Sequence, residues 1–497
     1  MSRMPHNGTD KKQRPLNFVF LFSDQHSPHM LGCYGNEAIR TPHLDALAAR
    51  GVRFTAACCN SPLCVPSRAA MATGNYASRG GYWDNAFAYD GALPSWAGRL
   101  EEEGRRVTAI GKMHFKNDSP ATGFVDQRIP LHIKDGTGDI YGAIRDRTIT
   151  RPQFRQAILD AREGESDYIR YDREVAARAA GFLTQAAAED RGPFALYVGF
   201  VTPHFPLIAP PEFTALYPDA SSVRRPTDFD RAHWADHPVL NDYRRYCCQE
   251  GLTDAQRLNA VRIYYALCSF LDAQVGRVLD AITQAGLWEN TCVVYTSDHG
   301  DAMGEHGLFF KSTMYEGSVG VPLLLAAPGL APGTACSTPV SLVDIYPTAL
   351  DCLGVAPNDY DRTLPGRSLL DTAARPDDPG RTVYAEYLAF GCYSGAFMIR
   401  DGHYKYVYYP GERPQLFDLE HDPEERTDLA GDPALAPVLA ACHEKLRAVC
   451  DPDATERRAE AAQKACLDRY GGRDEFLRTF TPMLFSPIPD LDQNGSP

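Results

Sequence analysis

The fold is decided by the apolar run Leu16-Asn17-Phe18-Val19-Phe20-Leu21-Phe22, which is followed directly by the polar residues Ser23-Asp24-Gln25-His26. A short, nearly continuous apolar run is typical of a strand that is covered on both faces, as in a parallel sheet. Open α/β sheets bind their ligands at the carboxyl ends of such strands. The sequence therefore predicts a buried first strand with a ligand site at its end.

Strand-like and helical segments alternate along the chain after this first strand. The strand-like runs are 107–110, 194–201, 292–296 and 321–327, and the helical patterns are 42–50, 172–188 and 253–285. The alternation predicts an α/β fold with a mostly parallel, doubly wound sheet. After about residue 370, strand-like pieces at 382–386, 396–400, 405–409 and 415–418 precede a helical stretch at 433–450. Closely spaced strands with turns predict a smaller C-terminal subdomain with an antiparallel sheet and a helix.

These patterns divide the chain into four expected segments. We expect a disordered lead-in at 1–15, the large α/β domain at 16–370, the subdomain at 371–450 and a C-terminal tail at 451–497. The tail is charged at first and then rich in aromatic residues and proline. Two interpretations of it stay open: a solvated tail, or an arm that packs on a neighbouring subunit of a homo-oligomer.

The composition excludes several classes of protein. The chain has 497 residues with 44% hydrophobic and 23% charged residues, which excludes intrinsic disorder, a collagen-like fibre and a small disulfide scaffold. Its net charge of −14 provides no general attraction to nucleic acid or anionic lipid, so neither is an expected partner. No apolar stretch approaches the ~18 residues of a membrane span, and residues 1–15 contain no visible export signal. The fourteen cysteines include the adjacent pairs Cys58-Cys59 and Cys247-Cys248, which rarely form disulfides, so without an export signal we expect reduced thiols in a cytoplasmic protein. The absence of a Cys-x-x-Cys pair argues against a zinc ribbon or a thioredoxin-like redox site.

The most specific motif is Cys64-Val65-Pro66-Ser67-Arg68, in which a cysteine stands where a loop leads into a predicted helix. The helix N-terminus and Arg68 both favour negative charge at Cys64 or at a group bound there. The motif resembles the signature of the sulfatase family, which directs conversion of the cysteine to formylglycine. The resemblance extends over residues 18–353 and 415–425, and it implies the fold of the alkaline phosphatase superfamily. It also implies a formylglycine-generating or sulfatase-maturating enzyme as a partner.

Two strand ends predict a metal site. Asp24 and Gln25 end the first strand, and Asp298-His299-Gly300 follow the run at 292–296. Carboxylates at the ends of two parallel strands can converge on one divalent cation. The family resemblance implies Asp24, Gln25, Asp298 and His299 as metal ligands together with residue 64.

The Asp-Gln and Asp-His pairs look more like those of choline sulfatases and phosphonate monoester hydrolases than the Asp-Asp and Asp-Asn pairs of many arylsulfatases. Fewer carboxylates and one imidazole make the site softer, so calcium and manganese both remain candidates.

Cationic and imidazole side chains follow the other predicted strands. Lys112 and His114 come after the strand at 107–110, His204 follows the strand at 194–201, and Lys311 lies twelve residues after His299. A single Lys is usually a solvated surface residue, and a single His is usually a structural one. These four residues match the Lys, His, His and Lys that surround the sulfate in the family.

The resemblance implies a mechanism for hydrolysis of a small anionic ester. Hydrated formylglycine at position 64 attacks sulfur, and the metal together with Arg68 favours its ionised hydroxyl. Lys112 and Lys311 neutralise the sulfuryl oxygens. His204, with or without Lys311, protonates the leaving oxygen, and His114 deprotonates the second hydroxyl so that sulfate leaves.

Two alternatives to a sulfatase remain. The same residues can hydrolyse a phosphonate monoester or a phosphodiester, because phosphorus and sulfur oxyanions are similar in shape and charge. A catalytically inactive binding protein on this fold is disfavoured, since every expected catalytic position holds a competent residue.

We further expect Asp301 to orient a neighbour of the metal if it acts at all, and we expect Trp83, Trp96, Tyr89 and Phe115 to pack in the core.

Overall fold

A computed structural model describes residues 15–189, 192–481 and 485–491. Its centre is an eight-stranded sheet with the order β11-β2-β10-β9-β1-β7-β4-β5. The strands are β1 (Asn17–Asp24), β2 (Val52–Phe54), β4 (Val107–Lys112), β5 (Asp126–Leu131), β7 (Ala195–Pro203), β9 (Thr291–Ser297), β10 (Leu323–Ala326) and β11 (Thr334–Cys336). The first strand lies in the middle, parallel to both β7 and β9. The mostly parallel sheet is confirmed, and β10 is its antiparallel member, paired with β9 and β2.

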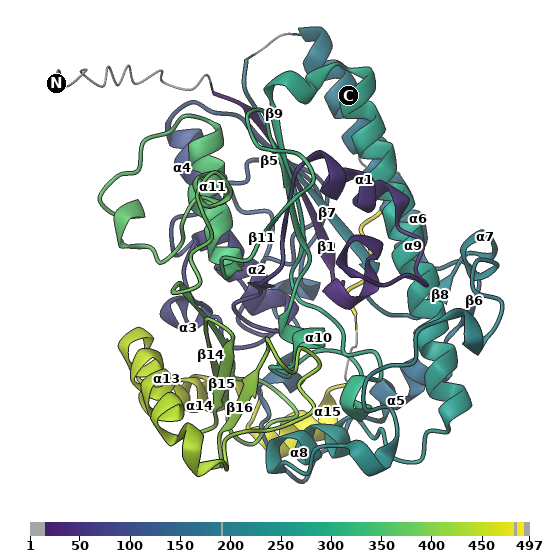
Figure 1. Ribbon diagram of the computed structural model, residues 1–497, viewed down its shortest axis with the longest axis vertical. Coiled ribbons are helices and arrows are strands. Elements are labelled where there is room, and N and C mark those ends of the chain that lie inside the picture. Colours follow the sequence, from purple (N-terminus) through teal and green to yellow (C-terminus); the bar gives the residue numbers. More distant parts are fainter. Residues whose placement is uncertain (1–14, 190–191, 482–484, 492–497) are drawn as a thin grey trace, which may run out of the picture.

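Helices cover both faces of this sheet (Figure 1). One face carries α1 (Pro42–Arg50), α6 (Asp167–Glu189) and α9 (Asp254–Gln284), and the other carries α2 (Cys64–Thr73), α4 (Trp96–Glu102) and α11 (Ile345–Cys352). Alternate residues of β1 enter two different cores: Phe18 and Phe20 pack in the same cluster as Trp96, whereas Val19 and Leu21 pack in the cluster of α6 and α9. Because successive side chains of a strand point to opposite faces, a strand covered on both sides must be apolar at nearly every position.

The C-terminal subdomain contains a four-stranded antiparallel sheet, as expected. Its strands are β13 (Thr382–Tyr387), β14 (Ala396–Asp401), β15 (Tyr404–Tyr408) and β16 (Gln415–Asp418), and they pair in sequence order. Helix α13 (Ala436–Val449) packs on this sheet through Cys442 and Leu446. The subdomain lies at the lower left of Figure 1, below the central sheet.

Shorter elements connect these parts. They are β3 (Ala57–Cys58), β6 (Arg162–Glu163), β8 (Ile208–Ala209), β12 (Val340–Ser341), α3 (Ala77–Gly80), α5 (Pro152–Leu159), α7 (Pro211–Thr214), α8 (Pro238–Tyr246), α10 (Glu316–Val319) and α12 (Leu369–Ala373). The division at residues 370 and 450 stays a prediction. The expected lead-in lies, apart from Pro15, outside the described residues.

The segment after residue 450 differs from the expected solvated tail. It forms α14 (Pro452–Asp468) and α15 (Arg473–Thr479). Helix α14 buries Thr455, Ala459 and Gln463, which recur every four residues and so lie on one face. Gln463 Nε2 donates to Asp84 Oδ2 at 2.8 Å, which ties the helix to the large domain. The buried side of the helix also includes Glu456, Cys466 and Leu467, and this mixture of polar and apolar residues is not the apolar stripe by which a sequence pattern reveals a packed helix. An arm on a neighbouring subunit stays a prediction.

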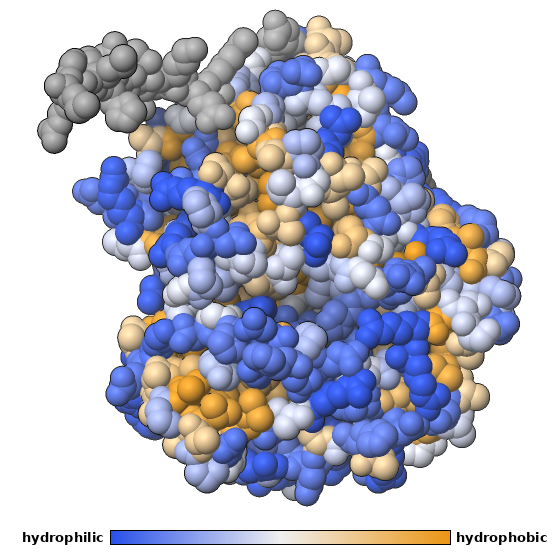
Figure 2. Space-filling view, in the orientation of Figure 1, coloured by the Kyte–Doolittle hydropathy of each residue, from blue (hydrophilic) through white to orange (hydrophobic). Residues whose placement is uncertain are grey.

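The face in Figure 2 is mostly hydrophilic, and its apolar residues gather in small patches, one of them over the C-terminal subdomain. Within the described part of the chain, no helix has both the length and the apolar character that crossing a membrane requires.

Candidate active site

The candidate site lies at the carboxyl ends of four neighbouring strands. The strands β9, β1, β7 and β4 are adjacent in the sheet, and they lead into Asp298 and His299, Asp24 and Gln25, His204, and Lys112 and His114. Because the four strands run parallel, these residues emerge at one edge. Lys311 and the first turn of α2 complete the cluster, so the structure brings all ten predicted site residues together.

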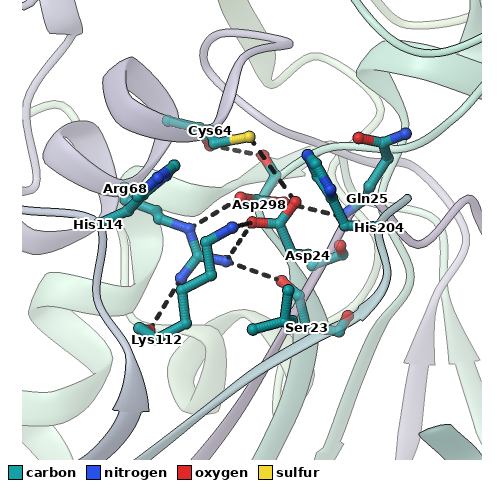
Figure 3. A network of polar contacts seen from close by, with 12 residues as sticks. Ser23, Asp24, Gln25, Cys64, Arg68, Lys112, His114, His204 and Asp298 are labelled. Carbon is teal, nitrogen blue, oxygen red and sulfur yellow. Dashed lines mark hydrogen bonds and ion pairs between the residues drawn. The ribbon is translucent and has the colours of Figure 1, made fainter. Parts of the chain in front are cut away.

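Helix α2 begins at Cys64, and all ten of its residues are buried. Pro66 and Ser67 occupy its first turn, and Ser67 Oγ donates to the carbonyl oxygen of Asp298 at 2.5 Å. This bond ties the start of the helix to the end of β9. The Cys64 sulfur therefore lies at a buried helix N-terminus that faces the strand ends (Figure 3).

Arg68 lies one helical turn after Cys64 and contacts both carboxylates of the site. Its Nε donates to Asp298 Oδ2 at 2.8 Å, and its Nη2 donates to Asp24 Oδ2 at 3.0 Å. The guanidinium therefore spans both carboxylates, and it is fully buried (Figure 3). Arg68 does not line the pocket above Cys64. Its position suits it to hold the two carboxylates, and its effect on a nucleophile at residue 64 is indirect.

Two lysines contact the cluster from other sides. Lys112 Nζ lies 2.7 Å from Asp24 Oδ2, and Lys311 Nζ donates to Gln25 Oε1 at 2.5 Å and to Cys64 Sγ at 3.2 Å. Burial alone would raise the pKa of Asp24, but the cations of Lys112 and Arg68 hold that pKa well below its usual range. Burial and the charge of Asp24 raise the pKa of Asp298 to about 6.

Four of the five expected metal ligands form one compact group. The ligand atoms of Asp24, Cys64, Asp298 and His299 all lie within 4.8 Å of one another and are buried. His299 Nδ1 donates to the carbonyl of Gly300 at 2.9 Å, which leaves the lone pair on Nε2 as a ligand. Two buried carboxylates this close repel each other, and a divalent cation between them offsets that repulsion. The donor set therefore fits a divalent metal ion.

Gln25, the fifth expected metal ligand, is held beside the other four by Asp301 and Lys311. Its Nε2 donates to Asp301 Oδ2 at 2.5 Å, and its Oε1 accepts from Lys311. Asp301 also accepts from the backbone N–H groups of Met303 and Phe310, so its carboxylate is fixed in place. The contacts show that Asp301 holds Gln25, and its role beside a metal ion stays a prediction. This arrangement fixes the amide of Gln25 with its oxygen beside Lys311.

Both candidate proton-transfer histidines are buried and neutral at pH 7. Burial and the cation of Lys311 hold the pKa of His204 well below its usual range, and burial and Lys112 do the same for His114. His204 Nδ1 donates to the carbonyl of Phe205 at 2.6 Å, so its lone pair is on Nε2. A neutral imidazole is ready to accept a proton, and it becomes a donor once a bound anion raises its pKa.

The pocket above Cys64 has a polar floor and aromatic walls. Its floor is formed by Cys64, Lys112, His114, His204 and Lys311. Its walls include Phe154, Tyr168, Phe205, Phe390 and Phe485, with Asn85, Asp139 and Arg151 among the polar residues. The aromatic residues Trp83, Trp96, Tyr89 and Phe115 are buried in the core, as expected.

Comparison with known proteins identifies the family. The family model described as Sulfatase matches residues 16–355. The chain belongs to the sulfatase family. A second model, N-sulphoglucosamine sulphohydrolase, C-terminal, matches residues 304–451 of this sulfatase.

The relatives include a choline-sulfatase of Rhizobium meliloti (strain 1021), which is 33% identical over 442 aligned residues. The alignment covers 84% of this chain and 83% of that protein. They also include arylsulfatase K of Homo sapiens, which is 30% identical over 439 aligned residues. This alignment covers 83% of this chain and 78% of that protein. These relatives and the family model show that the protein is a sulfatase enzyme.

Solved structures support the fold of this sulfatase. The phosphonate monoester hydrolase of Agrobacterium radiobacter superposes with a TM-score of 0.69 at 23% identity, covering 88% of this chain and 95% of that chain. The enzyme from Silicibacter pomeroyi superposes with a TM-score of 0.67, also at 23% identity, covering 88% and 95% of the two chains. At this identity the likeness shows the fold alone.

Two residues that hold this sulfatase site in place have no signal in the sequence. Tyr197 OH accepts from Arg68 Nη1 at 3.1 Å and donates to the carbonyl of Lys112 at 2.7 Å. Asp172 accepts from the backbone N–H groups of Val201 and Thr202, just before His204. Both stand within ordinary strand or helix patterns, and only the tertiary structure brings them to the site.

Proposed function

We propose that this sulfatase hydrolyses the sulfate ester of a small alcohol or phenol at the site around residue 64. In this proposal Cys64 is converted to formylglycine, and Asp24, Gln25, Asp298 and His299 hold one divalent cation together with residue 64. The supporting observation is the place of the Cys64 sulfur, 3.2 Å from both His299 Nε2 and Lys311 Nζ, at the floor of the pocket. The sulfur stands in for the oxygen of the modified residue.

The unmodified cysteine is poorly suited to this reaction. Burial and the charge of Asp24 raise the pKa of the Cys64 thiol to about 11, so the sulfur stays protonated at neutral pH. The carbon of an unmodified cysteine also carries no hydroxyl whose deprotonation would form a C=O bond and break the bond to sulfate. Hydrated formylglycine supplies both a nucleophilic oxygen and that second hydroxyl, and a divalent cation supplies positive charge beside them.

The side chains of the chain itself provide the anion site. Arg68, Lys112 and Lys311 carry three positive charges against the three carboxylates of Asp24, Asp298 and Asp301. The charges of these side chains therefore balance, and a divalent cation would supply the net positive charge that a sulfate monoester needs. Lys112 and Lys311 line the pocket, and we assign to them the stabilisation of the sulfuryl oxygens.

The two histidines have opposite roles in proton transfer: His204 donates a proton and His114 accepts one. His204 has its lone pair on Nε2, and the negative charge of a bound ester raises its pKa, so that it carries the proton needed by the leaving oxygen. His114 is neutral and accepts the proton of the second hydroxyl as sulfate leaves. Lys311, beside Cys64, is the alternative donor to the leaving oxygen.

Sulfate is favoured over phosphonate as the substrate group. The relatives at 30% identity or more, which cover over four fifths of this chain, are sulfatases. The phosphonate monoester hydrolases resemble the chain at 23% identity. Calcium and manganese both remain candidates for the cation, and the maturation enzyme, a cytoplasmic location and a homo-oligomer stay predictions.

The experiment uses purified protein with an aryl sulfate and an aryl phosphonate, each with and without a strong chelator. We expect turnover of the sulfate, a much slower phosphonate reaction and loss of both in chelator. Cys64→Ala, which removes the modified residue, is expected to abolish turnover while the protein stays folded. Faster hydrolysis of the phosphonate than of the sulfate contradicts the assignment of the substrate.

A further inference from the structure

The C-terminal segment 485–491 of the chain reaches the candidate active site. Ser486 Oγ lies 3.0 Å from Nε2 of His114, although 372 positions separate the two residues. Ser486 is only 9% exposed, and its carbonyl accepts a hydrogen bond from the hydroxyl of Tyr168 at 2.8 Å. Ser486 and its neighbour Phe485 both line the pocket above Cys64.

This segment is fixed along one helix. Tyr168 belongs to α6, and so does Arg178, whose Nη2 donates to the carbonyl of Leu491 at 3.2 Å. The side chains of Ile488 and Leu491 pack against the core cluster of α6 and α9. In Figure 1 the yellow segment runs alongside α6. The position of Ser486 is therefore set at both ends of the segment by the same rigid element.

The contact decides which ring nitrogen of His114 holds the proton. His114 is 8% exposed, and its Nδ1 has no hydrogen-bond partner among the described residues. A buried N–H without a partner is rarer and more costly than an unpaired acceptor. The proton therefore belongs on Nε2, which donates it to Ser486 Oγ, and the lone pair is on Nδ1.

The backbone of His114 is held in an uncommon conformation, whereas its ring depends on the contact with Ser486. The φ of 59° at His114 lies in the left-handed region, which non-glycine residues adopt infrequently. Its N–H is held by the carbonyl of Leu131 at 2.9 Å. The bond to Ser486 is the one hydrogen bond that the described residues make to the ring of His114. Without it, both the rotation of the ring and its tautomer are free to change.

We propose that Ser486 is a positioning residue for His114, and that the C-terminal segment of the chain thereby completes the active site. The hydroxyl of Ser486 holds the ring in one orientation and keeps the lone pair on Nδ1. The inference rests on the proposed role of His114 as the proton acceptor when sulfate leaves. The hydrogen bonds of Ser486 go to His114 and Tyr168, and in this proposal it acts on the reaction through the histidine.

The first test reads the tautomer directly and does not depend on metal, modification or turnover. Protein labelled with ¹⁵N-histidine is studied by long-range ¹H–¹⁵N correlation, and His114 is assigned by the signal lost in His114→Gln. We expect the Nε2–H tautomer in the unaltered protein and a shift toward a mixture of tautomers in Ser486→Ala. A His114 signal that is the same in both proteins overturns the proposal.

The second test is a double-mutant cycle on sulfate ester turnover with Ser486→Ala and His114→Ala. Loss of one orienting hydrogen bond is expected to lower kcat about 3- to 10-fold in Ser486→Ala. The same substitution is expected to change nothing further in the His114→Ala background. An equal loss in both backgrounds, or no loss in either, overturns the proposal.

The matched control is Thr479→Ala. Its hydroxyl donates to the carbonyl of Glu475 within α15, away from the pocket, so kcat is expected to stay unchanged. A comparable loss of kcat in Thr479→Ala shows that any lost hydroxyl in this region disturbs turnover, and it overturns the specific role of Ser486. Absence of turnover in the unaltered protein contradicts the proposed function instead and leaves the tautomer measurement as the test of Ser486.

Discussion

Replacement of Arg68 by lysine tests the claim that this residue holds the two carboxylates. Arg68 donates five hydrogen bonds, to Asp298, Asp24, Tyr197 and the carbonyls of Ser23 and Lys112. A lysine keeps the charge but has three donors on one nitrogen, so at least two of these five hydrogen bonds are lost, although Asp24 and the carbonyl of Lys112 each keep a second donor. At about 0.5–1.5 kcal/mol for each hydrogen bond lost, Arg68→Lys is expected to lower the free energy of unfolding by about 1–3 kcal/mol.

The assay is urea unfolding of the unmodified protein in chelator, followed by tryptophan fluorescence, with refolding curves to check that both directions coincide. Turnover is not the readout, because Arg68 also belongs to the signature that directs formylglycine formation. The matched control is Arg173→Lys, since Arg173 is 38% exposed and pairs with Glu165 on the surface. A surface pair of this kind contributes about 0–1 kcal/mol. An Arg68→Lys protein within about 0.5 kcal/mol of the unaltered one refutes the reasoning.

Three further predictions follow from the site. Asp298→Asn is expected to lower metal occupancy and turnover together, because a carboxamide lacks the charge that the cation needs; unchanged occupancy by elemental analysis contradicts this. His204→Ala is expected to slow an alkyl sulfate about 10²–10⁴-fold and a nitrophenyl sulfate much less, whereas Lys112→Ala slows both alike; equal losses in His204→Ala assign the proton donor elsewhere. Burial raises the pKa of Asp172 to about 7, so its contribution to stability is present at low pH and is lost as pH rises from about 4 toward 7. Asp172→Asn is expected to flatten the pH dependence of unfolding in that window, and an unchanged profile contradicts it.

The sequence was sufficient for the parts of the fold that local pattern dictates. The apolar run around Phe18 predicted a buried strand, because a strand covered on both faces needs apolar residues at consecutive positions. Polar residues directly after the runs marked the strand ends, and parallel strands then had to bring Asp24 and Asp298 to one edge.

Other features depend on tertiary contacts that leave no local pattern. The run around Leu324 is apolar in either direction, so the sequence could not reveal that β10 is antiparallel. The motif places Arg68 one helical turn after Cys64, but it does not show that the guanidinium pairs with both Asp24 and Asp298. Ser486 is 372 positions from His114, and a lone serine in a proline-rich stretch carries no signal of its partner.

The most direct test of the account is the chemical state of residue 64 in active protein. Peptide mass analysis is expected to show an aldehyde at Cys64, with one oxygen in place of one sulfur and two hydrogens. Preparations with different degrees of conversion are expected to hydrolyse the sulfate ester in proportion to the aldehyde fraction. Full turnover by protein in which residue 64 is entirely a thiol contradicts the account.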